Sequence, residues 1–385
     1  MEYKEKKTWQ NGEAKDITFI VTEECQLSCK YCYESNKKRN SMTFQKAKKI
    51  VNYCLSDDVS SKNDYVVWNF IGGEPLLEIE LINDISEYIK TQTRLLDHKW
   101  QDNYKFAIVS NGLMYNDKRV KEYINQNRWN LSFTISIDGT KEKHNMQRVY
   151  ENGKGSFDDV ISNVKNWVND FHFTATKATI SHSDLSLIKE SVLFLYSLGI
   201  NDVYMNVVYE DVWEKGDPDI FKEQLIELAD EIIDNELYKY HTCTLFDNYI
   251  GNPIPSSMTT NWCGTGNMLA FDHDGNIYPC LRFHDFSLTD RPKKTLGNVD
   301  TGIDKNKLRP FELLNRKFQS DDECNNCMVA SGCGWCQAHN YELSKEGTIN
   351  FRSHNICEMH KARVKANNYY WSKLYLALSK KEEIK

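Results

Sequence analysis

The sequence predicts an α/β fold built on a parallel sheet. Six short runs of apolar, β-branched or aromatic residues recur in the first half of the chain, and segments with helical periodicity separate them. Repeated strand–helix units with nearly continuous apolar strands favour a parallel sheet covered by helices, either doubly wound or closed into a partial barrel. The six runs are Ile17–Thr22, Tyr65–Phe70, Phe106–Ser110, Ser132–Ile137, Phe173–Ser181 and Val203–Val208.

The segment from Met42 to Cys54 illustrates the helices between these strands. Phe44, Ala47 and Ile50 fall on one face at helical spacing, and Cys54 lies on the same face. We expect Cys54 to be a core residue, because a buried free cysteine commonly behaves as a small hydrophobic side chain. Six such units are fewer than a complete eightfold barrel requires.

Polar and glycine-rich motifs follow the first four predicted strands. Cys25 comes soon after the first strand, Gly72-Gly73-Glu74-Pro75 after the second, Ser110-Asn111-Gly112 after the third and Ser136-Ile137-Asp138-Gly139 after the fourth. In parallel sheets the functional residues lie at the carboxyl ends of the strands. These motifs should therefore face one mouth of the fold.

The pattern changes after Tyr209. A long helical stretch from Phe221 to Tyr240 leads into GNPIPSSMTTNW, whose prolines indicate a linker, and a cysteine-rich module begins near Cys263. A lysine-bearing helix after Cys357 closes the chain. We expect three parts: a barrel over 1–225, a helical linker over 226–262 and a cysteine-rich module over 263–385.

Bulk composition excludes several classes of protein. The net charge of −7 and pI near 5.9 argue against nucleic-acid binding, which needs clustered Lys and Arg. The N-terminal residues hold no apolar signal region, and no stretch approaches the ~20 apolar residues of a membrane span. We expect a cytoplasmic protein.

Twelve cysteines in a chain without an export signal favour metal–thiolate sites over disulfides. Cys25, Cys29 and Cys32 offer three thiolates within eight residues. Three ligands on a four-iron cluster leave one iron open to another ligand, unlike an electron-transfer cluster held by four cysteines. A catalytic zinc site with an open position is the alternative.

The spacing C-x3-C-x-aromatic-C after the first strand resembles the signature of the radical SAM superfamily. That resemblance implies that the triplet binds a 4Fe–4S cluster that cleaves S-adenosylmethionine to a 5′-deoxyadenosyl radical. It implies a partial (β/α)6 TIM-like barrel, with the GGEP motif holding the cofactor's amino group. The residues implied to contact S-adenosylmethionine are Gly72, Gly73 and Glu74 at the amino group, Ser136 and Arg148 at the carboxylate and ribose, and Tyr31 and Val207 at adenine.

The C-terminal cysteines resemble the SPASM extension of radical SAM enzymes, which carries two auxiliary 4Fe–4S clusters. The final pair is separated by two residues, whereas the family usually has three. The resemblance implies three clusters in all, and Cys243 or an open site would complete the second auxiliary one. A structural zinc knuckle is the alternative for the C-x2-C pairs. The implied sets are Cys324, Cys327, Cys333 and Cys357 for one cluster, and Cys263, Cys280 and Cys336 for the other.

Enzymes with both parts commonly modify peptides or proteins, so the resemblance implies a maturase that forms a thioether or carbon–carbon cross-link in a ribosomally made peptide. A sulfatase maturase is the alternative. Those enzymes carry an Asp after the cysteine matched by Cys280, where this chain has Leu281. Other acid or base candidates in this region are better explained as turn or surface residues, namely Asp272, Asp274, His284 and Asp285.

The expected partners are a precursor peptide and a protein that donates electrons. Only twenty-four residues precede Cys25, too few for a leader-binding domain, so we expect a precursor peptide to bind elsewhere or through another protein. The basic run Lys37-Lys38-Arg39 is interpreted as a solvated face, or as a docking site for a flavodoxin or ferredoxin electron donor. A non-catalytic iron–sulfur electron carrier is the alternative from another class of function.

Overall fold

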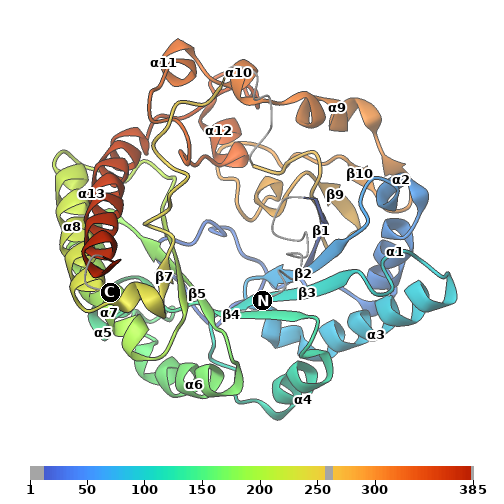
Figure 1. Cartoon of the computed structure of the whole chain (residues 1–385). Coiled ribbons are helices and arrows are strands. Elements are labelled where there is room, and N and C mark those ends of the chain that lie inside the picture. Colours follow the sequence, from blue (N-terminus) through green and yellow to red (C-terminus); the bar gives the residue numbers. More distant parts are fainter. Residues whose placement is uncertain (1–12, 256–262, 383–385) are drawn as a thin grey trace.

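A computed structural model describes residues 13–255 and 263–382. The six predicted strands are all present, with ends shifted by a few residues, and helices follow them around a ring (Figure 1). The fold is thus α/β, as expected. The strands of the ring are β1 (Lys15–Thr22), β2 (Val66–Gly72), β3 (Tyr104–Ser110), β4 (Leu131–Ile135), β5 (Ala175–Ile180), β6 (Asp202–Val207) and β7 (Thr242–Cys243).

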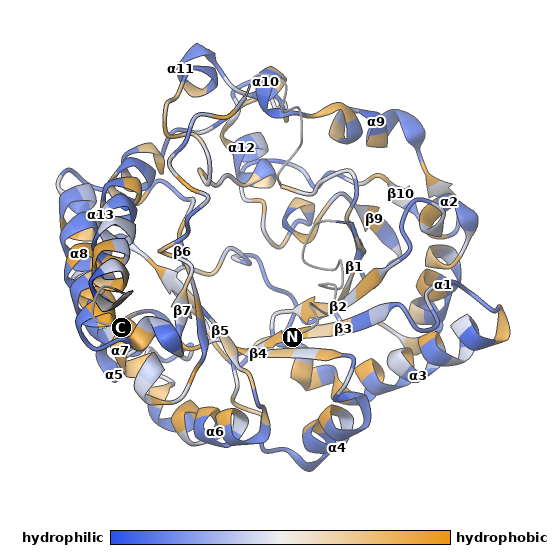
Figure 2. Ribbon diagram, in the orientation of Figure 1, coloured by the Kyte–Doolittle hydropathy of each residue, from blue (hydrophilic) through white to orange (hydrophobic). Residues whose placement is uncertain are grey.

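Helices form the outer layer of the ring, and Figure 2 shows that they carry both hydrophobic and hydrophilic residues. In α3, isoleucines at 79, 82, 85 and 89 are buried at helical spacing, which gives the helix an apolar side toward the strands. The α-helices are α1 (Phe44–Cys54), α2 (Asp57–Ser60), α3 (Ile79–Leu95), α4 (Lys118–Asn127), α5 (Lys141–Gln147), α6 (Phe157–Asp170), α7 (Ile188–Ser197), α8 (Asp217–Asp234), α9 (Lys305–Leu313), α10 (Arg316–Gln319), α11 (Asp322–Asn325), α12 (Gln337–Leu343) and α13 (Cys357–Glu382). Short 3₁₀ turns cover Pro75–Glu78, His182–Leu187, Leu237–Lys239 and Leu281–Phe283.

The ring is made of two sheets. One has the strand order β11-β10-β9-β8-β1-β2-β3-β4, and the other has the order β5-β6-β7. Neighbours within β1–β4 and within β5–β7 are parallel. A single bridge between Ser136 and Lys177 joins the two sheets after β4, so the carboxyl ends of all these strands share one mouth.

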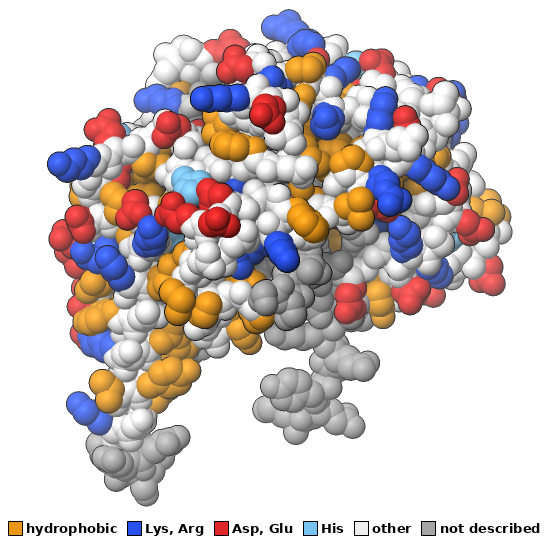
Figure 3. Space-filling view, turned by 90° about the horizontal axis from the view of Figure 1, so that it is seen from above, with side chains coloured by type: hydrophobic (Ala, Val, Ile, Leu, Met, Phe, Trp, Pro, Cys, Tyr) orange, Lys and Arg blue, Asp and Glu red, His pale blue; other side chains and the backbone are white. Residues whose placement is uncertain are grey.

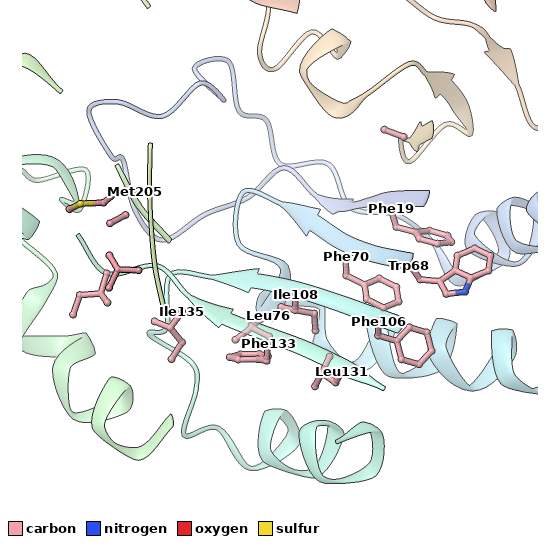
Figure 4. Packing of buried hydrophobic residues seen from close by; sticks show 14 of the residues in the cluster. Phe19, Trp68, Phe70, Leu76, Phe106, Ile108, Leu131, Phe133, Ile135 and Met205 are labelled. Carbon is pink, nitrogen blue, oxygen red and sulfur yellow. The ribbon is translucent and has the colours of Figure 1, made fainter. Parts of the chain in front are cut away.

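The core lies between the strands and the outer helices. Residues of β2 alternate between buried and half-buried positions, as period-2 strands do, and Trp68 and Phe70 are fully buried. The Phe70 ring lies 5.7 Å from Phe19 and 5.8 Å from Phe106 between centroids (Figure 4). Buried aromatic side chains of this kind dominate core stability.

The cysteine-rich region adds strands that the sequence did not reveal. They are β8 (Leu269–Phe271), β9 (Asn276–Tyr278), β10 (Gly297–Asn298) and β11 (Gly302–Ile303), each two or three residues long. Strand β8 pairs in parallel with β1, with Ile17 opposite Leu269. This pairing places the start of the cysteine-rich region beside the strand that precedes Cys25.

The helix expected over Phe221–Tyr240 is shorter at its end than predicted. Helix α8 ends at Asp234, and Glu236 has a left-handed backbone with φ 55°. Such a residue interrupts the right-handed helix. The predicted linker lies partly in 256–262, outside the described residues.

Helix α13 returns the chain to the barrel and lies along α8 (Figure 1). Asp230 of α8 accepts hydrogen bonds from Tyr369 Oη at 2.6 Å and from Lys373 Nζ at 2.8 Å. No helix among the described residues has the length and apolarity to cross a membrane. Charged side chains of both signs are interspersed over the face in Figure 3.

Candidate active site

Cys25, Cys29 and Cys32 lie in the loop after β1 and line one cavity of about 660 Å³. All three are half-buried. Burial raises the pKa of the Cys25 thiol to about 12 and also raises the pKa of Cys29. Three sulfurs that line one cavity fit a metal cluster, whose positive charge would stabilise the thiolate form of a buried cysteine.

The cysteine loop is fixed by backbone hydrogen bonds to the rest of the barrel. Ser28 N donates to Val149 O at 2.7 Å, and Lys30 N donates to Gln147 O at 2.9 Å. On the other side, Glu74 N donates to Glu24 O at 2.7 Å. The loop is therefore held between the end of α5 and the motif after β2.

The two glycines of the GGEP motif make this close approach possible. A Cβ atom at Gly72 would lie 1.9 Å from Thr22 O, and one at Gly73 would lie 2.2 Å from Glu24 O. Only glycine leaves room for the backbone here. In this structure the two glycines let the end of β2 pack against the cysteine loop. The sequence motif alone does not predict this packing role.

Glu74 is buried and ties β2 to β3. Its Oε1 accepts from Ser110 Oγ at 2.8 Å and Leu76 N at 3.1 Å, and its Oε2 accepts from Asn111 N at 2.7 Å. Burial raises the pKa of this carboxyl, although these hydrogen bonds oppose the shift. A carboxylate offers about four lone-pair directions, so Glu74 keeps capacity for one further donor such as an ammonium group.

Asp138 brings two of the expected cofactor residues together. Its Oδ2 accepts from Tyr31 Oη at 2.5 Å and from Arg148 Nε at 3.1 Å, while Oδ1 accepts from Thr179 N at 3.1 Å. Asp138 is fully buried, and although burial opposes its charge, Arg148 and Lys143 hold its pKa below the ordinary value. Sequence reasoning missed this residue, whose only signal was its place in the motif after β4.

Ser136 and Val207 occupy other positions in the barrel. Ser136 is buried at the bridge to Lys177 between the two sheets, two residues before Asp138 in the chain. Val207, the last residue of β6, lines a separate cavity of about 120 Å³ with Tyr209 and Arg363. The expected adenine contacts Tyr31 and Val207 therefore come from different walls of the barrel.

Another cavity, of about 500 Å³, lies between the barrel mouth and the cysteine-rich region. Tyr31 and Cys32 line it on the barrel side, and Arg282 and His339 line it on the other. Arg282 Nη2 donates to Glu210 Oε1 at 2.6 Å, so residues from both halves of the chain form one wall.

Cys263, Cys280 and Cys336 lie near enough to interact electrostatically. Burial and the negative charge of Cys336 raise the pKa of Cys263, and burial with the charges of Cys263 and Cys336 raises that of Cys280. Cys243 lies elsewhere, buried in β7, where burial raises its pKa to about 12 against the effect of Arg363. Its surroundings do not favour Cys243 as a ligand shared with those three cysteines.

Cys324, Cys327, Cys333 and Cys357 line a cavity of about 40 Å³. Cys333 Sγ accepts a hydrogen bond from Arg352 Nη2 at 3.2 Å, and the Arg352 guanidinium lies 4.3 Å from the Trp335 ring centroid. Four converging sulfurs suit a soft metal centre, either an iron–sulfur cluster or zinc.

Two nearby side chains extend the donor set of this cysteine site. His354 Nε2 lies 3.6 Å from Cys324 Sγ and 2.9 Å from Asp321 Oδ2, and these three groups could hold a metal ion together. Cysteine spacing does not reveal Asp321, Arg352 and His354, because these residues carry no motif of their own.

The weaker acid and base candidates have structural roles. Asp272 accepts from Tyr278 Oη at 2.8 Å and Asn276 N at 2.8 Å, within the β8–β9 hairpin. Asp285 pairs with Lys38 at 3.1 Å on the surface. These contacts agree with the expectation of a turn residue at Asp272 and a surface residue at Asp285. His284, by contrast, is buried, and its Nε2 lies 3.7 Å from Asp272 Oδ2. Cys54 is fully buried in the core, as expected.

A family model described as the radical SAM superfamily matches residues 19–180. Three curated relatives span most of the chain. An uncharacterized protein of Methanocaldococcus jannaschii is 28% identical, over 77% of this chain and 91% of its own length. The radical SAM cyclopropyl synthase TigE of Paramaledivibacter caminithermalis is 19% identical, over 92% and 74%. A cysteine-type anaerobic sulfatase-maturating enzyme of Clostridium novyi is 25% identical, over 83% and 88%.

A solved structure, native anSMEcpe with bound AdoMet and Cp18Cys peptide, shares the fold with a TM-score of 0.69. It is 18% identical, and the match covers 94% of this chain and 99% of that one. Together with the family match over β1 to β5, these similarities confirm the fold class expected from the sequence. S-adenosylmethionine and a 4Fe–4S cluster are accordingly its cofactors. The chain is a radical SAM enzyme with a C-terminal SPASM-like domain.

Proposed function

We propose that this enzyme modifies a ribosomally made peptide by forming a thioether or carbon–carbon cross-link. The observation that carries the proposal is the cavity of about 500 Å³ between the two halves of the chain. Cys32 and Tyr31 line it at the barrel mouth, so a peptide bound in this cavity would lie beside the cysteine triplet. The structure of anSMEcpe holds a bound peptide, which supports a peptide substrate, and TigE is named a cyclopropyl synthase.

In this proposal Cys25, Cys29 and Cys32 hold the radical cluster. Gly72, Gly73 and Glu74 would bind the amino group of S-adenosylmethionine, Ser136 and Arg148 its carboxylate and ribose, and Tyr31 and Val207 its adenine. Bound together, the two cofactors supply a 5′-deoxyadenosyl radical able to remove a hydrogen atom from an unreactive carbon.

The protein's own contribution is orientation. Asp138 fixes the Tyr31 hydroxyl and the Arg148 guanidinium with one oxygen, so both side chains enter the site already ordered. Glu74 is held by three donors and keeps one lone pair for an ammonium group. The Arg282–Glu210 pair and His339 would orient the peptide on the opposite wall.

We further propose two auxiliary 4Fe–4S clusters, one at Cys324, Cys327, Cys333 and Cys357, the other at Cys263, Cys280 and Cys336. The second set would leave one iron open. Three clusters require about twelve iron atoms per chain, whereas one cluster with zinc requires about four. Metal analysis of anaerobically purified protein separates these possibilities.

The second candidate function is sulfatase maturation, favoured by the Clostridium novyi relative. Leu281 stands where the resemblance places the base of those enzymes, which favours cross-linking.

An acidic flavodoxin or ferredoxin is the proposed electron donor. Lys38 and Arg39 offer it exposed positive charge.

The test uses reconstituted protein with S-adenosylmethionine and dithionite. Wild type and Cys54→Ala, a matched cysteine variant outside the proposed sites, should form 5′-deoxyadenosine, and Cys29→Ala should form none. Equal product from Cys29→Ala would overturn the cluster assignment, and no product from wild type would favour an electron carrier.

Substrate class is tested by adding peptides from small reading frames beside the gene, and separately a sulfatase-derived cysteine peptide. Loss of two hydrogen atoms from the former supports cross-linking. Conversion of the latter's thiol to an aldehyde would establish sulfatase maturation instead.

A further inference from the structure

The three consecutive cations Lys37, Lys38 and Arg39 occupy different environments. Lys38 and Arg39 are exposed, and Lys38 Nζ pairs with Asp285 on the surface at 3.1 Å. All three side chains line the cavity of the three cysteines, and Lys37 is the half-buried one. Its Nζ donates a hydrogen bond to Cys32 Sγ at 3.3 Å. The expectation of a uniformly solvated basic face therefore fails for Lys37.

The Lys37 ammonium lies against the sulfur of an expected cluster ligand. Lysine side chains are ordinarily charged at neutral pH. Charge-assisted hydrogen bonds of this kind are stronger than neutral ones, and partial burial limits screening by water.

We propose that Lys37 sets the reduction potential of the cluster held by Cys25, Cys29 and Cys32. One-electron reduction adds a negative charge to the cluster, and the electron comes from an external reductant such as dithionite or a low-potential redox protein. A fixed cation against a ligand sulfur stabilises the reduced form more than the oxidised form. Net charge and hydrogen bonds to the sulfurs are known determinants of cluster potential.

This inference rests on the proposed cluster ligands but not on the identity of the peptide. A chain with Cys25, Cys29 and Cys32 all changed to Ala tests the first assumption, because it should hold about four fewer iron atoms than wild type. Its spectrum also supplies the baseline for signals from the auxiliary sites. No peptide is needed at any step.

The experiment is a redox titration of reconstituted full-length protein, followed by electron paramagnetic resonance after that baseline is subtracted. At the potential where half of the wild-type cluster is reduced, Lys37→Met should show about a tenfold lower ratio of reduced to oxidised cluster, which corresponds to about 59 mV. Lys38→Met, the neighbouring control, should titrate with wild type. Lys37→Arg keeps the charge and should lie between Lys37→Met and wild type.

Identical titration curves for Lys37→Met and Lys38→Met would overturn the proposal. If Lys37→Met holds fewer iron atoms than wild type, Lys37→Gln replaces it, since the amide keeps polarity without charge. A lowered potential in that variant supports the proposal. Loss of the cluster from both neutral variants would show that Lys37 is needed for assembly, and the potential-setting role would be rejected.

Discussion

The barrel and the cysteine-rich region share one hydrophobic core but differ in the length of their strands. Strands β1 to β6 are five to eight residues long and bury a continuous set of aromatic and branched side chains. Strands β8 to β11 have two or three residues each, and polar contacts link the loops around them. Arg316 Nη2, for example, donates to Cys324 O, and Gln319 Nε2 to Gln337 Oε1. We therefore expect the barrel to depend on apolar burial and the second region to depend also on metal at its cysteine sites.

Removing the metal should produce the largest difference in stability between the two regions. Anaerobic chelation of iron should leave residues 15–207 folded and expose 263–357 to proteases, because ligand thiolates that lose metal no longer cross-link the loops. Limited trypsin digestion followed by mass spectrometry measures this effect. Equal protection of both regions before and after chelation would show that the second region is also stabilised by burial.

Truncating a buried residue of the barrel core should have the next largest effect on the free energy of unfolding. Trp68→Ala should cost about 3–5 kcal/mol, because Trp68 is fully buried and packs 6.0 Å from Phe19 and 5.8 Å from Trp100 between ring centroids. Denaturant unfolding followed by circular dichroism measures the loss. Exposed Trp129→Ala serves as the control and should change stability little.

Asp138→Asn should cost about 1.5–3 kcal/mol, since it weakens charged hydrogen bonds from Arg148 and Tyr31. Because the folded pKa of Asp138 is depressed, its contribution is present above its unfolded value of about 3.9 and is lost as pH falls below it. Stability measured between pH 7 and pH 3 should therefore fall less for Asp138→Asn than for wild type. Parallel curves would contradict the assigned role.

The smallest expected effects come from the N-terminal cap of one helix in each region. Thr43 accepts a hydrogen bond from Lys46 N at 3.2 Å at the start of α1, and Asn315 accepts one from Phe318 N at 3.2 Å at the start of α10. Each change to Ala should cost about 1 kcal/mol in iron-loaded protein. After iron removal only Thr43→Ala should still lower stability. A persistent effect of Asn315→Ala would mean that α10 stays folded without metal.

The sequence predicted the six barrel strands because each is long enough to show an apolar run. The same strand predictions put Cys25, Glu74 and Ser136 at the ends of strands. The family match covers this part of the chain. Strands β8 to β11 were missed because two or three residues cannot display a period. The end of α8 was missed because it depends on a left-handed residue, Glu236, that has no strong local signal.

The site was predicted less completely than the fold. Spacing identified the cysteine sets, but the partners of those residues are distant in sequence. Asp138 meets Tyr31 across 107 positions, and Arg352 meets Cys333 across 19. Such contacts arise only when strand ends and loops converge, so one sequence without its fold does not reveal them.

The short segment Cys333-Gly334-Trp335-Cys336 joins the two cysteine sets of the second region. A Cβ atom on Gly334 would lie 3.1 Å from Tyr209 Oη, so barrel and segment are packed closely at this point. Metal bound by Cys333 would also fix the backbone that presents Cys336, and the reverse holds as well. Iron uptake by the two sets should therefore be cooperative, with half-filled molecules rarer than independent binding would produce.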